Sequence, residues 1–422
     1  MLSTIKRSLP LQLLTAAILA WAIASMLPVV TNISGPVTEH ITEQAWYQLI
    51  LLGKTTYIGL LKMVIGLVVM LSLMQGITNI GSTLKLKTLG VSTLAFYSLT
   101  SIIAISLGLG AALLMPEWQP LVEPVVVADH INLIEQDTVT GSSITAKLLA
   151  MALVNPFSAL VNGNLLAIVL FSLLFSVSLL RSLPQDHVVF TVIAGLNAGL
   201  NKLVQSIIRL APVAVFAIVF EFTVTGNTGL FGQLALFALL VFALTLIHGV
   251  IVLPTLAKIF TGIKFSTLFK AISAPLAMAF ATSSSSATLP LSMQAAENEL
   301  GISQSTSSFV LPLGAVMNMD GTALFEGVAA IFLAQLFGID LSTTGIVMIF
   351  IMAMVSSVGA PGMPSGSMSG MQLVMLAAGI PLEGIAILLI IERPLDTFRT
   401  AVNVEGDLIA ALVVDKWQQN KI

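Results

Sequence analysis

Long apolar stretches dominate this chain and determine the solvent in which it can fold. Apolar residues make up 57% of the 422 residues, charged residues only 9%, and the mean hydropathy is +1.02. Soluble domains carry roughly 25% charged residues, so this chain has too few to cover a surface that faces water. A membrane-spanning helix needs about 20 mainly apolar residues, and several stretches supply that length. The sequence therefore predicts an all-α polytopic membrane protein in the lipid bilayer.

The residue types that are scarce exclude several classes of function. Cysteine is absent, which excludes disulfides, thiolate metal sites and cysteine nucleophiles. The four histidines are scattered without metal-ligand spacing: His40, His130, His187 and His248. Gly53-Lys54-Thr55 resembles the end of a P-loop, but Gln48 stands where that motif needs glycine. Without a P-loop, no ATP-driven pump is indicated, and no cofactor is expected. The net charge of −3 and the lack of a basic run argue against a nucleic-acid partner.

Six apolar stretches before residue 265 predict six long helices, about 9–31, 46–76, 89–114, 147–181, 189–222 and 229–258. Lysine and arginine flank alternate ends of these stretches, whereas segment 115–140 is acidic and has no basic residue. Cytoplasmic loops are enriched in lysine and arginine. We therefore expect a multi-pass protein of the plasma (inner) membrane with both termini in the cytoplasm. The first stretch is longer than a typical secretion-signal core, which favours an uncleaved helix over a cleaved signal.

After residue 265 the apolar segments become short and are interrupted by three polar or Gly/Pro clusters, at 282–286 (TSSSS), 318–322 (NMDGT) and 359–366 (GAPGMPSG). Non-helical backbone at membrane depth persists only where protein buries it or where it lines a wet cavity. Paired interrupted segments are the best sequence pointer to the binding site of a transporter. Three such clusters between apolar flanks predict two re-entrant hairpins and one unwound helix. The alternative is that each cluster is a loop outside the membrane.

The last apolar segment, about 379–415, carries a polar stripe. On a helix of 100° per residue its members fall within roughly a 100° sector, with Glu405 on the opposite side. They are Glu392, Asp396, Arg399, Thr400, Asn403 and Asp407. A charge at the bilayer centre costs about 2.5–3.5 kcal/mol on insertion scales, so the stripe predicts a binding cavity or ion path. The alternative is an internal Asp396–Arg399 pair that binds no ligand, since the two are i, i+3 neighbours.

The side chains of the stripe favour one class of ligand. The Arg399 guanidinium can bind a carboxylate through two hydrogen bonds, and the Asp396 carboxylate can hold an ammonium group. Together they fit an acidic amino acid, with Asn403 and serine hydroxyls for a second carboxylate. Asp407 with Asn318 and Asp320 offers the hard oxygen ligands that a small monovalent cation requires.

Three motifs carry a resemblance to a known family: TSSSSATLP at 282–290, GAVMNMDGTALFE at 314–326 and ERPLDTFRTAVNVEGD at 392–407. They resemble the dicarboxylate/amino acid:cation symporter family, which includes archaeal aspartate transporters and vertebrate excitatory amino-acid transporters. The match is collinear from about 280 to 417. The resemblance implies that the protein is a transporter and not an enzyme, and that it forms a homotrimer. Each subunit would have eight transmembrane helices, two re-entrant helical hairpins, a static scaffold and an elevator-type transport domain.

The resemblance also implies a division of the chain. Residues 1–76 would form scaffold helices 1–2, and 77–145 helix 3 of the transport domain with an acidic extracellular loop. Residues 146–225 would form scaffold helices 4–5, and 226–422 the rest of the transport domain. That last part would contain helix 6, hairpin 1 (about 265–298), helix 7 (about 303–337), hairpin 2 (about 341–377) and helix 8 (about 379–417).

By position, the family's functional residues map onto this chain. Arg399 would read the side-chain carboxylate of the substrate and Asp396 its amine. The other implied substrate contacts are Asn403, Thr400, Thr322, Ser284, Ser285, Gly362 and Met363. The implied sodium ligands are Asp407, Asn318, Gly314 and Asn403; Tyr97, Thr100, Ser101 and Asp320; and Ser357, Val358, Ala360 and the backbone of Val316. Ser283 and Thr397 stand where relatives carry a second arginine, so the contacts that hold the hairpins must differ here.

Glu326 is the candidate proton carrier, because it follows the unwound motif by one to two helical turns. The alternative is a permanently protonated residue that hydrogen-bonds a backbone carbonyl. The leading interpretation is sodium-coupled symport of L-aspartate or L-glutamate, with the proton as the second candidate ion. The alternatives are a proton-coupled, neutral amino-acid or dicarboxylate carrier of the same fold, or a passive anion channel. An intramembrane serine hydrolase is disfavoured because 280–410 contains no histidine to act as base.

Overall fold

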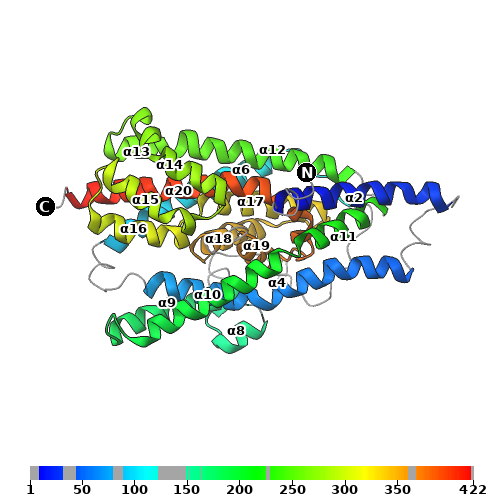
Figure 1. Ribbon diagram of the computed structural model, residues 1–422, viewed down its shortest axis with the longest axis horizontal. Coiled ribbons are helices and arrows are strands. Elements are labelled where there is room, and N and C mark those ends of the chain that lie inside the picture. The colour runs from blue at the N-terminus through cyan, green and yellow to red at the C-terminus, as the bar shows by residue number, and fades with distance from the viewer. Residues whose placement is uncertain are drawn as a thin grey trace.

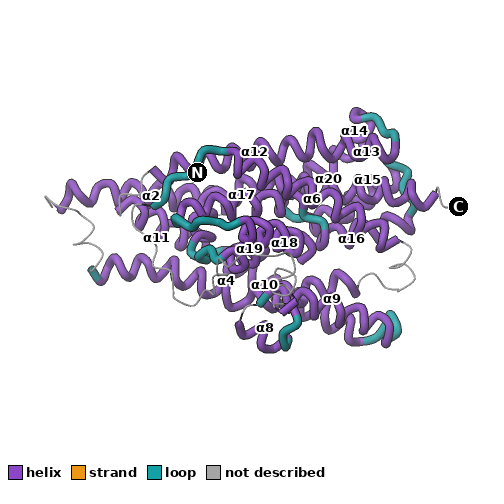
Figure 2. Tube along the Cα trace, turned by 180° about the vertical axis from the view of Figure 1, so that it is seen from behind, coloured by secondary structure: helices purple, strands orange, loops and turns teal. Residues whose placement is uncertain are grey.

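The computed structural model describes residues 9–31, 44–78, 89–121, 149–150, 152–162, 164–224, 229–359 and 367–419, and all its regular elements are helices (Figures 1 and 2). The first half contains α2 (Leu9–Thr31), α4 (Ala45–Thr78), α6 (Val91–Leu114), α8 (Pro156–Asn162), α9 (Leu165–Ser182), α10 (Val188–Ile208) and α11 (Ala211–Val224). The second half contains α12 (Gly229–Ile247), a π-helical turn η2 (His248–Val252), α13 (Leu253–Thr261), α14 (Phe265–Thr282), α15 (Ser285–Asn298), α16 (Gln304–Met317), α17 (Asp320–Leu336), α18 (Thr343–Gly359), α19 (Ser367–Ala378) and α20 (Gly384–Gln419).

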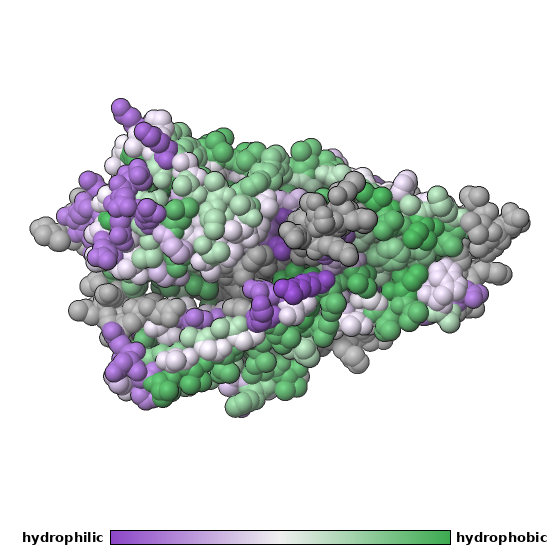
Figure 3. Space-filling view, in the orientation of Figure 1, coloured by the Kyte–Doolittle hydropathy of each residue, from purple (hydrophilic) through white to green (hydrophobic). Residues whose placement is uncertain are grey.

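Several helices have the length and composition of membrane spans. Within the described residues these are 91–114, 188–224, 229–261, 265–282 and 304–336. Figure 3 shows apolar side chains over most of the visible face, while hydrophilic residues gather at the end that holds the α9–α10 and α13–α14 loops. An apolar flank with a polar end is the surface that a lipid bilayer requires, which agrees with a multi-pass membrane protein.

The predicted single helix at 147–181 is wrong, because α8 and α9 are separate helices. Asparagine side chains begin both of them. Asn155 Oδ1 accepts a hydrogen bond from the Phe157 N–H at 2.9 Å, and Asn164 Oδ1 accepts from Ala167 N–H at 3.2 Å. Asparagine is a preferred N-cap residue. Pro156 fits the first helical position because an N–H at that position would have no carbonyl partner within the helix.

Two other predicted helices are interrupted. The stretch at 189–222 divides at Arg209–Leu210, just before Pro212 in the first turn of α11. The stretch predicted to end at about 258 continues to Thr261 but changes to π-helical hydrogen bonding through η2. Pro254 follows η2 and has no N–H for the regular i→i−4 ladder, and π turns of this kind occur mostly as single insertions in α-helices.

Two helices of the second half of the chain, α17 and α20, are enclosed by the others. α17 is buried along its whole length apart from Gln335. α20 packs against α12, α13, α14, α15, α16 and α17. α14 and α15 pack as a pair joined at Ser283 and Ser284, as do α18 and α19 on either side of 360–366, which lie outside the described residues. The helix predicted at 303–337 is interrupted at Asn318–Met319, inside the cluster where an unwound segment was predicted. The last helix begins at Gly384 instead of 379, after a turn that follows Pro381.

Helices of the first half pack on one another at the other side of the molecule. α4 contacts α9, α10 and α11, and α11 contacts α2. In Figure 1, α4, α8, α9 and α10 lie below the layer formed by α12 to α20. α6 is the exception, because it packs against α17 in the second group.

The contact between α6 and α17 depends on Gly108. A Cβ atom at this position would lie 2.8 Å from the Leu324 carbonyl oxygen, whereas one at Gly110 meets nothing within 4 Å among the described residues. Gly108→Ala should therefore overpack this contact at a cost of about 1–3 kcal/mol. We expect it to melt about 1–3 °C below Gly110→Ala in detergent-purified protein, because in a chain of 422 residues each kcal/mol shifts the melting temperature by about 1 °C. Both variants gain the same helix propensity, so equal melting temperatures would contradict the close packing.

Candidate functional site

The interruption between α16 and α17 is joined to α6 and α20 by polar contacts. Asn318 Nδ2 donates to Asp407 Oδ1 at 2.9 Å, and Ser101 Oγ on α6 donates to Asp320 Oδ1 at 2.7 Å. Asn318 and Asp320 are at most 1% exposed. Two helices therefore supply carboxylates to a buried polar centre beside the break.

Several other predicted sodium ligands lie around the same break. Thr100 Oγ1 donates a long hydrogen bond to Asn318 Oδ1 at 3.5 Å. Tyr97 OH donates to the Val310 carbonyl at 2.9 Å, and Ser101 and Ser357 hydroxyls lie 3.2 Å apart. A Cβ atom on Gly314 would overlap both Tyr97 OH and Asp407 Oδ1. α16 can therefore approach α6 and α20 only with glycine at position 314.

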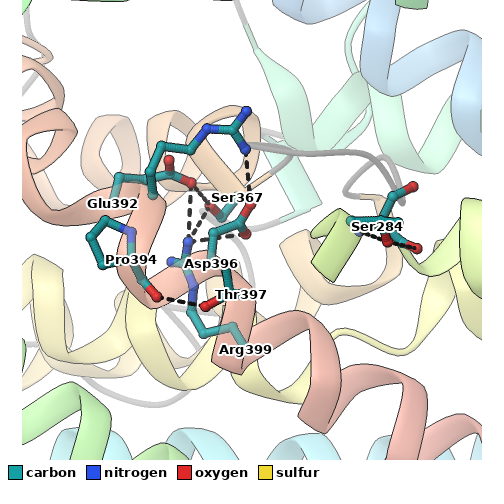
Figure 4. Close-up of polar contacts among 9 residues, drawn as sticks. Ser284, Ser367, Glu392, Pro394, Asp396, Thr397 and Arg399 are labelled. Atoms are coloured by element: carbon teal, nitrogen blue, oxygen red, sulfur yellow. Dashed lines mark hydrogen bonds and ion pairs between the residues drawn. The ribbon is translucent and has the colours of Figure 1, made fainter. Parts of the chain in front are cut away.

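Arg399 is the largest fully buried side chain among the described residues, and it forms the second polar centre. Its Nη2 atom donates to Glu392 Oε1 and Ser367 Oγ, both at 3.1 Å, and to Asp396 Oδ1 at 3.2 Å (Figure 4). Its Cζ atom lies 4.1 Å from the ring centroid of Phe325, a cation–π distance. Its Nε and Nη1 atoms have no hydrogen-bond partner in the part of the chain that the structure describes. Two donor groups of a buried guanidinium are therefore available to an anion.

The predicted internal pair of Asp396 and Arg399 does form, but it is one part of a larger network. The second oxygen of Asp396, Oδ2, lies 3.5 Å from Arg393 Nη1. Two carboxylates and two guanidiniums thus alternate along one side of α20. An unpaired charge is costly at membrane depth, so this alternation allows the helix to stay buried.

Asn403 connects α20 to the first turn of α17. Its Oδ1 accepts from Gly321 N–H at 2.8 Å, and its Nδ2 donates to Thr322 Oγ1 at 3.4 Å. Thr400 is buried on the same helix. Asn403 lies between the two polar centres in sequence, one turn after Arg399 and one turn before Asp407.

The predicted hairpin residues are only partly brought together. Ser284 caps α15 by accepting from Ala287 N–H at 3.2 Å, and Ser285 is buried beside it. In Figure 4, Ser284 lies apart from the Arg399 cluster. Ala360, Gly362 and Met363 lie outside the described residues, as does the side chain of Val358. Val316 lies in α16, partly buried against Gly76 of α4.

Glu326 is fully buried on α17. Ser356 Oγ on α18 donates to its Oε1 at 2.8 Å, and its Oε2 has no hydrogen-bond partner among the described residues. Glu326 therefore faces the α18–α19 pair and not a backbone carbonyl.

Four contributors were not predicted: His248, Ser356, Ser367 and Phe325. His248 Nε2 lies 3.3 Å from Asp320 Oδ2, and both side chains are fully buried. An ionisable residue inside an apolar helix is a signal in itself, so His248 could have been singled out. The others gave no signal, because serine and phenylalanine are common in such helices. No cluster of three His, Cys, Asp or Glu residues suited to a metal occurs in the described ranges.

Apolar spanning helices around a buried, charged centre define a multi-pass membrane protein with the arrangement of a secondary transporter. The profile of the sodium:dicarboxylate symporter family matches residues 9–417. The chain belongs to this family of secondary transporters, which are not enzymes.

Several curated relatives align over most of the chain. The proton/glutamate-aspartate symporter of Escherichia coli K12 is 30% identical, covering 99% of this chain and 94% of the relative. The proton/sodium-glutamate symport protein of Geobacillus stearothermophilus is 30% identical over 86% of both chains. The human neutral amino acid transporter B(0) is 32% identical over 83% of this chain and 70% of the relative.

The Arg399 network yields a stability prediction. Glu392→Gln removes a charged acceptor of Arg399, and a hydrogen bond between charged groups contributes about 1.5–3 kcal/mol. We expect a lower melting temperature in detergent-purified protein. Glu405→Gln is the matched control on α20, since Glu405 is similarly buried but its Oε1 lacks a partner in the described chain. If the control loses as much stability as Glu392→Gln, the Glu392–Arg399 contact contributes nothing specific.

Proposed function

We propose that this protein is a secondary active transporter that couples inward movement of sodium to symport of an acidic amino acid, L-aspartate or L-glutamate. The observation that carries the proposal is the Arg399 guanidinium, which is fully buried and whose Nε and Nη1 atoms have no partner among the described residues. A guanidinium binds a carboxylate through two parallel hydrogen bonds. A neutral substrate would not require so costly a buried cation.

The rest of the substrate set is assigned by its neighbours. Asp396 contacts Arg399 and is the proposed partner of the substrate's ammonium group. Asn403, Thr400 and Thr322 are proposed contacts of the second carboxylate. The serine hydroxyls of 284 and 285, with Gly362 and Met363, would close the site from the two hairpin tips.

Sodium is the proposed coupling ion because the polar centre beside the helix break has the ligands that it prefers. Hard cations take oxygen ligands, such as carboxylates, amide carbonyls and backbone carbonyls. Asp407 and Asn318 are joined on one side of the break, and Asp320 and Ser101 on the other. The remaining proposed ligands are Gly314, Asn403, Tyr97, Thr100, Val316, Ser357, Val358 and Ala360.

The proposed mechanism requires a fold of eight spans and two re-entrant hairpins, with both termini in the cytoplasm. Residues 1–76 and 146–225 would form a static scaffold, and 77–145 with 226–422 an elevator-type transport domain, in a homotrimer. The packing of α6 with α17 rather than with α4 supports the assignment of α6 to the transport domain.

A neutral amino-acid carrier is the second candidate, because the human relative has that name. Arg399 favours the acidic substrate, since a neutral side chain would leave the guanidinium without its carboxylate. A proton-coupled carrier is the third, and the names of the bacterial relatives include protons. Glu326 is the residue that bears on that choice.

Uptake of labelled aspartate into proteoliposomes tests the proposal. We expect accumulation driven by an inward sodium gradient and none in its absence. Arg399→Cys should abolish aspartate uptake, because truncating one partner of a buried charged pair costs about 3–5 kcal/mol. Aspartate affinity within about twofold of wild type in Arg399→Cys, at saturating sodium, would overturn the substrate assignment. Sodium-independent uptake by the wild type would overturn the coupling.

Glu326 yields a separate prediction about protons. If it carries one in each cycle, the lumen of wild-type proteoliposomes acidifies during sodium-driven aspartate uptake. Glu326→Gln should then keep aspartate exchange but lose the acidification, because an amide accepts the Ser356 hydrogen bond without releasing a proton. A pH-sensitive dye trapped in the lumen provides the measurement. An unchanged lumenal pH in the wild type would make Glu326 a structural residue.

A further inference from the structure

His248 approaches the proposed sodium ligands from a helix that supplies none of the proposed ligands. It is the first residue of η2, and its Nε2 lies 3.3 Å from Asp320 Oδ2. The imidazole and the carboxylate are both fully buried. A contact between two polar groups so far from water either stabilises a required geometry or costs stability.

The two oxygens of Asp320 are held by different elements. Oδ1 accepts from the Ser101 hydroxyl on α6, and Oδ2 faces the imidazole on η2. Each carboxylate oxygen has two lone pairs, so each keeps one for a cation. The carboxylate is thereby fixed in orientation while remaining able to bind an ion.

The hydrogen bonding of His248 indicates which nitrogen donates. Its Nδ1 has no hydrogen-bond partner within the described part of the chain. With the proton on Nε2, the ring donates to Asp320, and only an acceptor on Nδ1 is left without a partner. A proton on Nδ1 would instead leave a buried donor unsatisfied, at about 1–3 kcal/mol. The neutral Nε2–H form also places no positive charge beside a site for sodium.

The π-helical turn explains how the imidazole reaches this position. Next to His248, a Cβ atom on Gly249 would lie 2.8 Å from Val402 Cγ2 and 3.2 Å from Glu405 Oε2 of α20. The turn therefore packs on α20 through glycine. One extra residue in a helical turn rotates the rest of the helix by about 100°, so η2 sets the direction of His248 relative to α13.

We propose that His248 is a positioning residue for the sodium site, holding the Asp320 carboxylate through an Nε2–H···Oδ2 hydrogen bond. This inference rests on the proposed function. Outer-shell partners of this kind orient the ligand and raise its affinity for the ion. His248 itself does not contact the ion or the substrate.

Sodium titration of aspartate binding to the purified full-length protein tests the role. His248→Leu and His248→Met remove the donor, and His248→Gln supplies an amide N–H in its place. Removing the donor should raise the sodium concentration for half-maximal binding by about tenfold, the lower end for loss of an outer-shell partner. His248→Gln should recover most of that loss. Aspartate affinity at saturating sodium should stay within about twofold of wild type in all three.

Thr245→Val is the matched control. Thr245 is buried one turn before His248, and its Oγ1 has no partner in the described residues. The sodium dependence of aspartate binding should therefore be the same in Thr245→Val as in the wild type. Unshifted sodium dependence in both His248→Leu and His248→Met overturns the inference. So does a loss of aspartate affinity that saturating sodium does not restore, because a packing defect would produce it. If wild-type binding is itself independent of sodium, the proposed function fails instead.

Discussion

The cost of placing charge in hydrocarbon determines how this protein is arranged. α20 carries acidic and basic residues through the middle of the molecule, and each would cost several kcal/mol beside lipid. The helix is therefore enclosed by α12 to α17, and apolar side chains cover most of the visible face of the molecule. α17 is enclosed as well, since it contributes Asp320 and Glu326. The apolar helices that surround this pair can face lipid because the polar groups are held inside.

Under the proposed function, the contacts of Arg399 allow one guanidinium both to hold its own place in the fold and to bind the substrate. Arg399 Nη2 contacts Glu392, Asp396 and Ser367, whereas Nε and Nη1 have no partner among the described residues. One nitrogen thus anchors the side chain, and two remain for binding. Phe325 covers the face of the guanidinium and keeps it in place without using a donor. A lysine has neither a planar face nor a fork of donors, so it could not divide the two tasks in this way.

Much of the fold could be predicted from hydropathy, because the helices at 9–31, 45–78 and 91–114 match their apolar stretches closely. The break at Asn318–Met319 was also readable, since a polar cluster interrupted an apolar segment. The prediction of one continuous helix at 147–181 was wrong, although Asn155-Pro156 and Asn164 are capping signals that indicate two helices. The π turn at His248–Val252 has no clear sequence mark, and the contact of His248 with Asp320 joins residues 72 positions apart. Such contacts depend on tertiary packing, which periodicity does not describe.

The helix break also explains how ion binding could affect substrate binding. Asn318 binds Asp407, and Gly321 and Thr322 bind Asn403, so both sides of the break are tied to α20. Asn403 lies four residues after Arg399 and four before Asp407, which places all three on one face of α20. Under the proposed function, sodium at Asp407 would hold Asn318, fix the first turn of α17 and orient Asn403 toward the substrate. The two ligands then stabilise the same arrangement of α17 on α20, and such coupling is reciprocal in free energy. Under the proposed function, coupled transport therefore depends on an interrupted helix, because a continuous one would present neither the free backbone groups nor the Asn318 side chain to α20.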